Sequence, residues 1–576
     1  MEYSRRIIII SVLSVIAAAI AIGRLFQLQI VQGDDFAAFA DRQYAIPTSS
    51  GSSRGIIYFQ DRDNRLVSAA SLETEYILAV NPQTAGRSEN LFEELSGVLP
   101  LDRGDFDGKL SRTHDPYEEL AVFTDADIAR RIDELELDSI SIYRRQKRTY
   151  PAGRLGSHVL GFVGKTTESG DGFTGRYGIE QSFNDTLDRA DAGLYVNFFA
   201  EVFANVGSII FAGDRQRHGD VILTIEPSVQ AFLVDELDAF RELWKADSIG
   251  GIVLEPKTGK IRAMAALPDF DPRRYGEEKD PSVFLNPLTE RVYEMGSVVK
   301  PLTIGAGIDS GAIEPETTYF DNGSLELNGR KISNYDGKGR GTVTMQDILN
   351  RSLNTGTVFI AEKMGIDTFR EYFTRYGFGE KTGVQLPGEV SGLVDNLQST
   401  RLVEHATASF GQGIAMTPLS LARALAVFAS GGSLMRPQIV ERILYENGDE
   451  KLFEPAVVGQ PVGKETAEIV TEMLVKVVDE ALLDGAASME DYSIAAKTGT
   501  AQIAKQGGGY YEDRFLHSFF GYFPAYEPRF LVFLYAENPR GANYASQTLT
   551  SHFMRIAKFL LNYYHIPPDR KPTFPS

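Results

Sequence analysis

An unbroken uncharged segment near the N-terminus, from Ile7 to Gly23, is the strongest constraint on how this chain can fold. Its 17 residues, IIIISVLSVIAAAIAIG, would rise about 1.5 Å each in a helix and nearly cross a hydrocarbon core of about 30 Å. Because Arg5 and Arg6 precede it, residues 1–6 are expected in the cytoplasm, residues 7–24 in the membrane and the remainder outside.

A cleaved signal peptide is the main alternative, because the Ala17–Ala21 stretch offers small residues for cleavage. However, the apolar pattern continues past Arg24 as LFQLQI, as one long helix leaving the membrane would. A retained anchor is therefore favoured over a signal peptide or a buried core helix. It implies a single-pass protein of the cell membrane, with its large domains outside the cytoplasm.

Length and composition narrow the remaining classes. The 576 residues predict two or three domains. A net charge of −20 argues against binding nucleic acid, since an acidic surface repels phosphate. The absence of cysteine excludes disulfides, thiolate catalysis and cysteine metal sites. No histidine pair has zinc-protease spacing, so neither a metal nor a cofactor is expected.

After the anchor, turn-rich Pro47–Gly55 resembles a linker, followed by a mixed region to about residue 220. From there strand and helix patterns are stronger, and strands at both ends of the domain predict an α+β sheet that pairs its own termini. The predicted strands are Ile56–Phe59, Tyr76–Val80, a hairpin around EPKTGK, Ser493–Ile503, Ser518–Phe523 and Arg529–Tyr535; the predicted helices are Asp125–Leu137, Met345–Met364, Thr417–Ser430 and Thr548–Tyr564.

Ser297-Val298-Val299-Lys300 is the first motif that indicates chemistry, and it is the one Ser-x-x-Lys string in the chain. A serine hydroxyl needs a base to become a nucleophile. Residues three apart on a helix share a face, and a buried lysine with a lowered pKa can be that base. Such a string arises by chance about once in a chain of this size, so it indicates a helix start equally well when taken alone.

Lys-Thr-Gly occurs three times, at Lys257, Lys381 and Lys497. The first two copies fall in turns, where the glycine supplies the bend. The third lies inside the strand pattern SIAAKTGTAQIA, where an extended substrate could pair with the backbone while the lysine and threonine bind its carboxylate. We therefore select Lys497, with Thr498, Gly499 and Thr500, as the candidate binding strand.

Ser352-Leu353-Asn354 is the loosest signal, because Ser-x-Asn also occurs at Ser88 and Ser182. Only the copy at Ser352 lies between the other two motifs. Its hydroxyl can relay a proton and the Asn354 amide can hold a substrate carbonyl.

Other patterns are interpreted as structural. Gly51–Gly55 matches a hydrolase nucleophile elbow, but a strand follows it where a helix is required. Gly170–Gly175 matches a dinucleotide-binding string that lacks its strand and helix. His405 and His517 are expected to be structural.

In the order Ser-x-x-Lys, Ser-x-Asn, Lys-Thr-Gly, the three motifs resemble those of the penicillin-binding proteins. The resemblance to class B members covers most of the chain, from about residue 5 to 560. It includes RLFQLQI after the anchor, RGIIYFQDRDN, RTYPAGRLGSHVLGFVG and GRYGIEQSFNDTL before residue 190, and LTIEPSVQ, ASFGQGIAMTPLSLARA and KTGTAQ after it.

The chain also departs from the family pattern. Met295 stands where proline is usual, Leu353 where serine is common and Ser420 where glutamine is frequent. The segment around Asp61 carries two apparent extra residues, which puts any partner contact there in doubt. None of these changes removes a reactive group.

The resemblance implies a peptidoglycan D,D-transpeptidase. Ser297 would attack a D-Ala-D-Ala stem peptide, and β-lactams would inhibit it. Lys300 would be the base. The side chains that would transfer protons and hold the substrate are Ser352, Asn354 and Lys497. The N–H groups of Ser297 and Thr500 would form the oxyanion hole.

The resemblance also implies the architecture. Residues 46–230 would be a non-catalytic, dimerisation-like pedestal, and residues 231–576 a penicillin-binding transpeptidase domain with an antiparallel sheet and helices. A membrane glycosyltransferase of the same pathway would be its partner.

Several alternatives stay open. The LPGEVSGLV segment and the length favour a division-type enzyme over an elongation type. A carboxypeptidase or β-lactamase-like hydrolase is a second possibility, although the Glu-x-x-Leu-Asn string of class A β-lactamases is absent. A non-catalytic β-lactam sensor and a pseudoenzyme scaffold are the others.

Overall fold

The computed structural model describes residues 54–85, 90–165, 173–189, 218–505 and 507–570, which belong to two compact units. Of the described residues, unit 1 contains 73–85 and 90–147, and unit 2 contains 54–72, 148–165, 173–189, 218–505 and 507–570. The predicted anchor at residues 7–24 lies outside the described residues. Among the helices of the described ranges, none combines the length and the apolar character needed to cross a bilayer.

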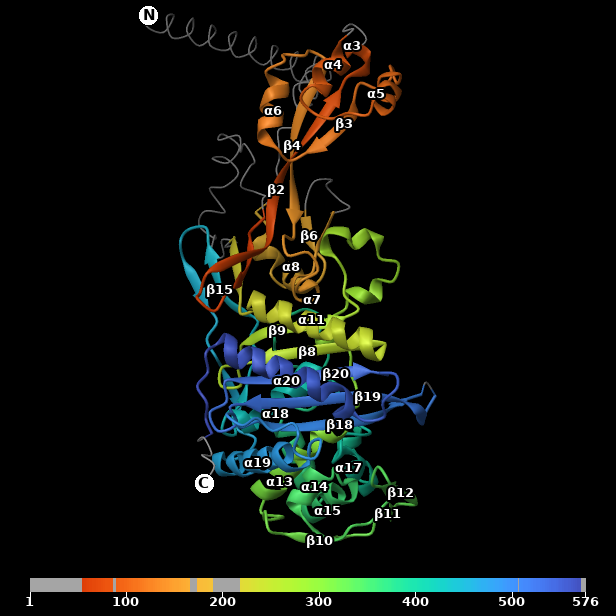
Figure 1. The fold of residues 1–576 in the computed structure, drawn as a ribbon, viewed down its shortest axis with the longest axis vertical. Helices are drawn as coiled ribbons and strands as arrows, with labels where there is room; N and C mark the ends of the chain where they lie inside the picture. The colour runs from red at the N-terminus through yellow and green to blue at the C-terminus, as the bar shows by residue number, and fades with distance from the viewer. Residues whose placement is uncertain (1–53, 86–89, 166–172, 190–217, 506, 571–576) are drawn as a thin grey trace, which may run out of the picture. The chain divides into compact units, whose positions relative to one another are not determined.

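Unit 1 is a small sheet covered by short helices (Figure 1). The later part of β2 (Leu66–Val80) pairs with β3 (Glu118–Phe123), and β4 (Ile140–Thr149) also pairs with β2. The helices are α3 (Pro82–Ala85), α4 (Leu91–Ser96), α5 (Arg103–Leu110) and α6 (Ala126–Asp133). Asp125 caps α6, so the helix predicted at residues 125–137 begins as expected and ends four residues early.

Unit 2 begins with a sheet that gathers distant segments. β1 (Ile57–Gln60) pairs with the start of β2 and with β7 (Gly219–Leu223), and the order continues through β15 (Val440–Tyr445) to β16 (Glu450–Leu452). Short elements pack beside it: α7 (Ser157–Leu160), β5 (Val163–Lys165), β6 (Phe173–Gly175), α8 (Gly178–Ser182) and α9 (Asn184–Leu187).

A buried ion-pair triad joins these segments. One carboxylate oxygen of Glu180 accepts a hydrogen bond from Arg54 Nε at 2.7 Å, and the other accepts one from Arg148 Nε at 2.7 Å. All three side chains are almost fully buried. Removing one partner of such a group typically costs about 3–5 kcal/mol, because a buried charge is then left uncompensated.

The centre of unit 2 is a five-stranded antiparallel sheet, drawn in Figure 1 as a stack with β18 at one edge. Its order is β18 (Ala495–Ala504), β19 (Tyr510–Phe523), β20 (Phe530–Glu537), β8 (Ser248–Leu254) and β9 (Ile261–Leu267). β8 therefore pairs with β20, so the sheet joins segments from both ends of the domain as the sequence predicts.

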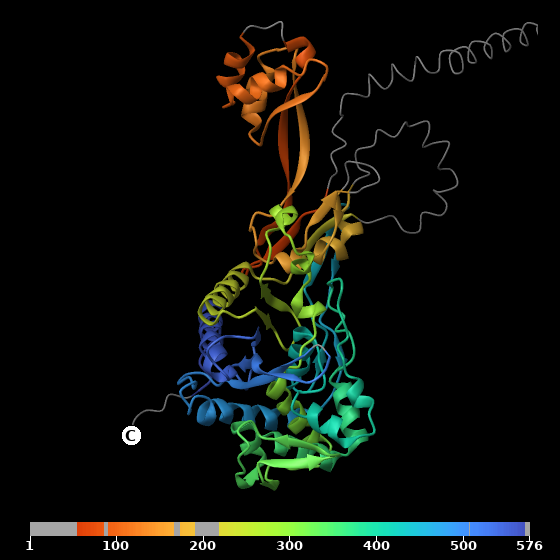
Figure 2. The same ribbon diagram turned by 90° about the vertical axis from the view of Figure 1, so that its right-hand side faces the viewer.

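Alternating side chains of this sheet enter two different cores. Phe519 packs with α11 (Pro227–Trp244) and α20 (Ala545–Tyr563), which lie side by side on one face in Figure 2. The adjacent Phe520 enters the core formed by α13 (Lys300–Asp309), α18 (Pro418–Ala429) and α19 (Lys464–Lys476). This period of two is what a strand buried on both faces requires.

The remaining elements of unit 2 are helices, single turns and short strands. They are η2 (Pro272–Glu277), η3 (Pro281–Phe284), α12 (Pro287–Glu290), η4 (Gly296–Val299), β10 (Thr318–Asp321), β11 (Ser324–Leu327), β12 (Arg330–Ser333), β13 (Gly341–Thr344), α14 (Met345–Asn350), α15 (Asn354–Met364), α16 (Ile366–Arg375), η5 (Asp395–Gln398), α17 (Leu402–Ala408), β14 (Leu434–Met435), β17 (Val457–Gly459) and η6 (Val477–Ala481).

The helical pattern predicted between Met345 and Met364 is interrupted. The chain forms α14 and α15 with a break between them, where Ser352 adopts a positive φ of 53°. A non-glycine residue in this region cannot continue a right-handed helix. The break places the Ser-x-Asn motif at a bend, with Asn354 as the first residue of α15.

Candidate active site

Ser297 lies in η4, a single 3₁₀ turn that leads directly into α13. Side chains three residues apart are aligned in a 3₁₀ helix, so Ser297 and Lys300 project from the same side of the segment. Ser297 is half-buried, whereas the residues on either side of it are buried. The motif therefore presents one accessible hydroxyl on an otherwise closed turn.

Lys300 is completely buried, and its ammonium is bound to the bend at Ser352. Its Nζ donates to the Ser352 carbonyl at 2.6 Å and to the Ser352 hydroxyl at 3.1 Å. Burial, and then repulsion from Lys497, holds the pKa of Lys300 well below its usual value. A neutral amine at this position can accept a proton.

Asn354 lies two residues after the bend at Ser352 and is half-buried. Its Nδ2 donates to the Ser333 carbonyl at the end of β12, at 2.9 Å. The structure thus brings Lys300 and Ser352 into contact, with Asn354 two residues further along the same segment, as the sequence motifs suggest.

The third motif lies on β18, an edge strand with β19 as its one neighbour in the described sheet. Lys497 is buried, and its Nζ donates to the Thr498 carbonyl at 3.1 Å. Burial lowers the pKa of Lys497 to about 8. Neither Lys300 nor Lys497 forms an ion pair with another described residue, so no described carboxylate neutralises the charge of Lys497, which is left for an anionic ligand.

Two glycines allow this strand to approach η4, the turn that carries Ser297. A Cβ on Gly499 would lie 2.7 Å from the Met295 carbonyl oxygen, and one on Gly296 would lie 2.8 Å from the Thr500 carbonyl oxygen. Both distances are too short for a real side chain. Gly296 also has a φ of +64°, which a residue with a side chain rarely adopts.

Further contacts fix the two segments together, and sequence reasoning did not anticipate them. Ser518 Oγ on β19 donates to the Met295 carbonyl at 2.7 Å. The Tyr510 hydroxyl donates to Glu294 at 3.0 Å. Thr500 Oγ1 accepts the Ala545 N–H at 3.1 Å, which fixes the strand to the start of α20.

The other two Lys-Thr-Gly copies are engaged in local turns. Thr258 Oγ1 donates to Glu255 at 2.9 Å, three residues before it. The Thr382 backbone N–H donates to Glu389 at 2.7 Å. Neither Lys257 nor Lys381 belongs to a strand, so only the Lys497 copy has the extended backbone that the hypothesis requires.

The histidines considered earlier have structural surroundings. His405 Nε2 lies 2.8 Å from the Ser399 carbonyl, and His517 Nδ1 lies 2.9 Å from Thr548 Oγ1. Burial lowers the pKa of His517 to about 4. Within the described ranges, no cluster of histidine and carboxylate side chains has the arrangement of a metal site. The elbow serine and residues 170–172 of the Gly170–Gly175 string lie outside those ranges, and Phe173–Gly175 forms β6.

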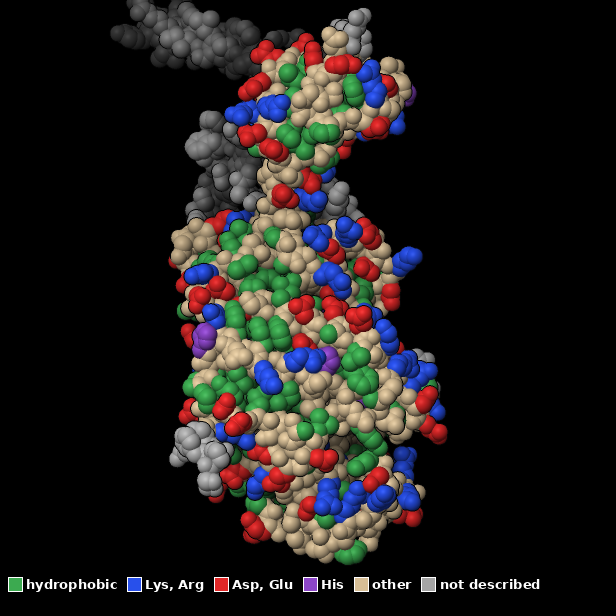
Figure 3. Space-filling view, viewed as in Figure 1, with side chains coloured by type: hydrophobic (Ala, Val, Ile, Leu, Met, Phe, Trp, Pro, Cys, Tyr) green, Lys and Arg blue, Asp and Glu red, His purple; other side chains and the backbone are tan. Residues whose placement is uncertain are grey.

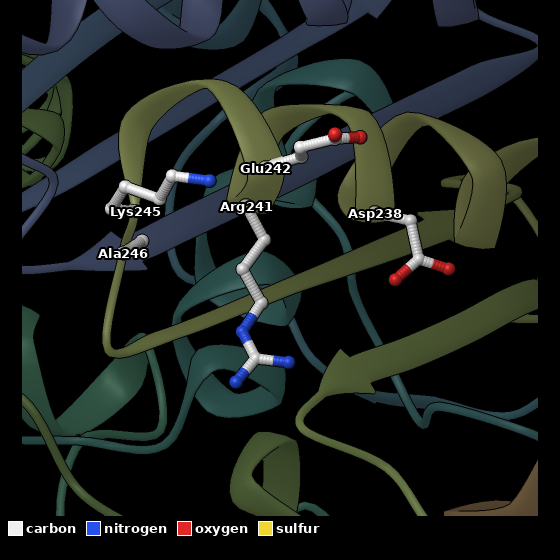
Figure 4. A pocket seen from close by; sticks show the side chains of 5 residues that line it. All are labelled: Asp238, Arg241, Glu242, Lys245 and Ala246. Atoms are coloured by element: carbon white, nitrogen blue, oxygen red, sulfur yellow. The ribbon is translucent and has the colours of Figure 1, made fainter.

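A separate pocket lies on α11 and is lined by Asp238, Arg241, Glu242, Lys245 and Ala246. Figure 4 shows that its charged groups point in different directions and do not meet at a common point. Figure 3 shows acidic and basic side chains mixed across the visible face of the described surface. The pocket contains no nucleophile and base in contact, so it offers no chemistry comparable to that around Ser297.

Comparison with known proteins agrees with this arrangement. Residues 249–558 match the penicillin binding protein transpeptidase domain, and residues 49–197 match the penicillin-binding protein dimerisation domain. Stage V sporulation protein D of Bacillus subtilis is 31% identical over 72% of this chain, and the match spans 63% of that protein's length.

Two further matches cover more of both chains. The peptidoglycan D,D-transpeptidase MrdA of Acinetobacter baumannii is 28% identical over 100% of this chain and 89% of its own length. Penicillin Binding Protein 2X from Streptococcus thermophilus has the same fold, with a TM-score of 0.74 at 21% identity over 90% of this chain and 80% of that one.

The two buried lysines predict a bell-shaped pH dependence for acylation by a fluorescent penicillin. The rate should rise as pH passes through the lowered pKa of Lys300, because the neutral amine is the base. It should fall above a pH of about 8, because Lys497 loses the charge that binds a carboxylate. In Lys497→Arg the residual rate should no longer fall there, since a guanidinium stays charged. If the acylation rate of this variant still fell at alkaline pH as in the wild type, the fall would belong to a group other than Lys497.

The three Lys-Thr-Gly copies predict unequal effects of substitution. Lys497→Ala should slow acylation by about 10- to 100-fold, because a charge-assisted hydrogen bond to the ligand carboxylate is worth about 1.5–3 kcal/mol. Lys257→Ala and Lys381→Ala are matched controls and should leave the rate nearly unchanged. Rates should be measured for variants with normal melting temperatures, and equal losses in all three would show that the wrong copy was selected.

Proposed function

We propose that this chain, which belongs to the penicillin-binding protein transpeptidase family, cross-links peptidoglycan stem peptides through an acyl-enzyme on Ser297. It is accordingly a serine-type D,D-transpeptidase of cell wall synthesis, and β-lactams are its inhibitors. The observation that carries the proposed site is the fully buried Lys300. Its amine contacts Ser352 and has a lowered pKa, and it lies one 3₁₀ turn from the half-exposed Ser297.

In the first step, Ser297 Oγ attacks the carbonyl carbon of the D-Ala-D-Ala peptide bond while its proton passes to neutral Lys300. The negative charge that develops on the carbonyl oxygen is stabilised by the N–H groups of Ser297 and Thr500. The C–N bond then breaks, and the departing D-Ala nitrogen takes up a proton through Ser352. The products are free D-Ala and an ester on Ser297.

In the second step, an amine from a neighbouring stem peptide attacks the ester carbonyl. It forms a new amide bond and gives up a proton, and Ser297 Oγ is protonated again as it leaves. In the first step, before D-Ala leaves, Lys497 and Thr498 bind the terminal carboxylate of the donor. In both steps the Asn354 amide holds a substrate carbonyl and Gly499 keeps the strand close. Because β18 is an edge strand, an extended peptide can add to it through backbone hydrogen bonds.

We assign residues 46–230 to a non-catalytic pedestal and residues 231–576 to the transpeptidase domain. Residues 7–24 are proposed to anchor the chain in the cell membrane, with residues 1–6 in the cytoplasm and both domains outside. A membrane glycosyltransferase that supplies glycan strands is the proposed partner. Support for the pedestal comes from the dimerisation-domain match at residues 49–197.

A D,D-carboxypeptidase or β-lactamase-like hydrolase would use the same serine but release the acyl group to water. The match of residues 49–197 and 249–558 to the two domains of transpeptidases favours transfer to an amine. The same two domain matches also favour a transpeptidase over a sensor that is acylated without turnover.

Replacing the nucleophile tests the central assignment. Ser297→Ala should form no covalent adduct with a fluorescent penicillin, because the attacking oxygen is absent. Intact-mass measurement of the purified protein should show the full penicillin mass on the wild type and none on the variant. Ser310→Ala is a suitable control, since Ser310 lies at the end of α13 and its hydroxyl donates to the Gly307 carbonyl. An adduct of normal mass on Ser297→Ala would refute the proposed nucleophile.

The position of the protein in the cell tests both the division role and the membrane anchor. A fluorescent fusion to the full chain should sediment with membranes and concentrate at the division site, since we favour a division-type enzyme. Fluorescence spread along the side wall would indicate the elongation type. Recovery of a soluble mature form that lacks residues 1–23 would contradict the anchor.

A further inference from the structure

A buried carboxylate lies behind the Asn354 end of the site. Asp321, the last residue of β10, is only 1% exposed. It accepts hydrogen bonds from the Thr355 hydroxyl at 2.8 Å and from the Asn334 amide at 3.0 Å. Two backbone N–H groups, of Gly323 at 2.9 Å and Arg340 at 3.1 Å, complete its shell. A buried carboxylate with this many donors holds all of its partners in fixed positions.

Asn334 extends this network to the helix that carries Asn354. Its Oδ1 accepts the Thr355 backbone N–H at 3.2 Å. The preceding residue, Ser333, accepts the Asn354 side-chain amide at 2.9 Å. Residues 333 and 334 are therefore bonded to residues 354 and 355, the first two residues of α15.

The start of α15 needs such an external partner. Its N-cap residue is Leu353, which has no side-chain acceptor for the free N–H groups of the first turn. The Asn334 amide oxygen supplies the missing acceptor from another segment. The orientation of the helix start, and of the Ser352 bend before it, is thus tied to the Asp321 network and not to a local cap.

We propose that Asp321, Asn334 and Thr355 are positioning residues for acylation, acting through Ser352 and Asn354. This rests on the proposed function of the Ser297 site. Ser352 must hold its positive φ and keep its hydroxyl 3.1 Å from Lys300 while a proton is relayed, and the bend has no side-chain cap of its own. Small displacements of positioned groups have large effects on rate.

Thr355 allows the cleanest test, because valine has nearly its shape but no hydroxyl. Thr355→Val should lower the rate constant of acylation at saturating penicillin by about 10- to 100-fold. The non-covalent affinity for penicillin should change much less, since Lys497 and Thr498 on β18 are intact. Thr355→Ser keeps the hydroxyl and should restore most of the rate.

Thr466→Val is the matched control. Thr466 is a buried threonine whose hydroxyl also donates to a carboxylate, that of Asp309 at the far end of α13, at 2.9 Å. This variant should acylate at close to the wild-type rate. Each variant should also be titrated to completion with penicillin, so that the number of competent sites is known independently of the rate.

The expected result for Thr355→Val is a full complement of sites that react slowly. The proposal would be overturned by a normal rate, by an equal loss in Thr355→Ser, or by a loss of titratable sites that accounts for the whole effect. Failure of the proposed function would give a different observation, because the wild type itself would then form no adduct on Ser297.

Discussion

The burial of two lysine side chains close to one another, without a carboxylate to neutralise either, constrains everything around the site. Removing an ammonium group from water costs several kcal/mol when no counter-charge is present. The protein limits this cost in two ways. The pKa of Lys300 is lowered, so its amine is readily neutral, and carbonyl oxygens of Ser352 and Thr498 accept hydrogen bonds from the two amines. An anionic substrate would relieve the remaining penalty, which gives the site an intrinsic preference for a carboxylate.

Close packing of backbone against backbone is the second requirement. The turn η4 and β18 approach so closely that no side chain fits at Gly296 or Gly499. Ser518 on β19 donates a hydrogen bond to the Met295 carbonyl, just before the turn. The central sheet in turn is fixed by helices on both faces, through the alternation seen at Phe519 and Phe520. The geometry around the candidate serine is therefore set by a rigid sheet and not by loop conformation.

The periodic parts of the fold could be predicted from sequence. The strands at the C-terminal end and the choice among three Lys-Thr-Gly copies depend on local patterns. β18 and β20 agree with the predicted strands, whereas β19 begins at Tyr510, well before the predicted start at Ser518. The helix predicted between Met345 and Met364 is wrong in one respect, because the break at Ser352 depends on contacts with Lys300 from another segment. Asp321 and Asn334 could not be recognised, because they lie in a glycine-rich stretch of short hairpins that has the composition of an ordinary loop. Their importance appears only when that stretch folds back on α15.

The pairing of β8 with β20 has a consequence for biosynthesis. Leu254 faces Leu531 across these two strands, so the central sheet cannot be completed until a segment far along the chain has been synthesised. β18, which carries Lys497, joins the sheet only through β19, so it too arrives late. Sheets built from such distant pairings form slowly, since a long loop must close before the contacts are gained. We infer that Ser297 and Lys497 come together only after the strands from both parts of the chain have been synthesised and have paired.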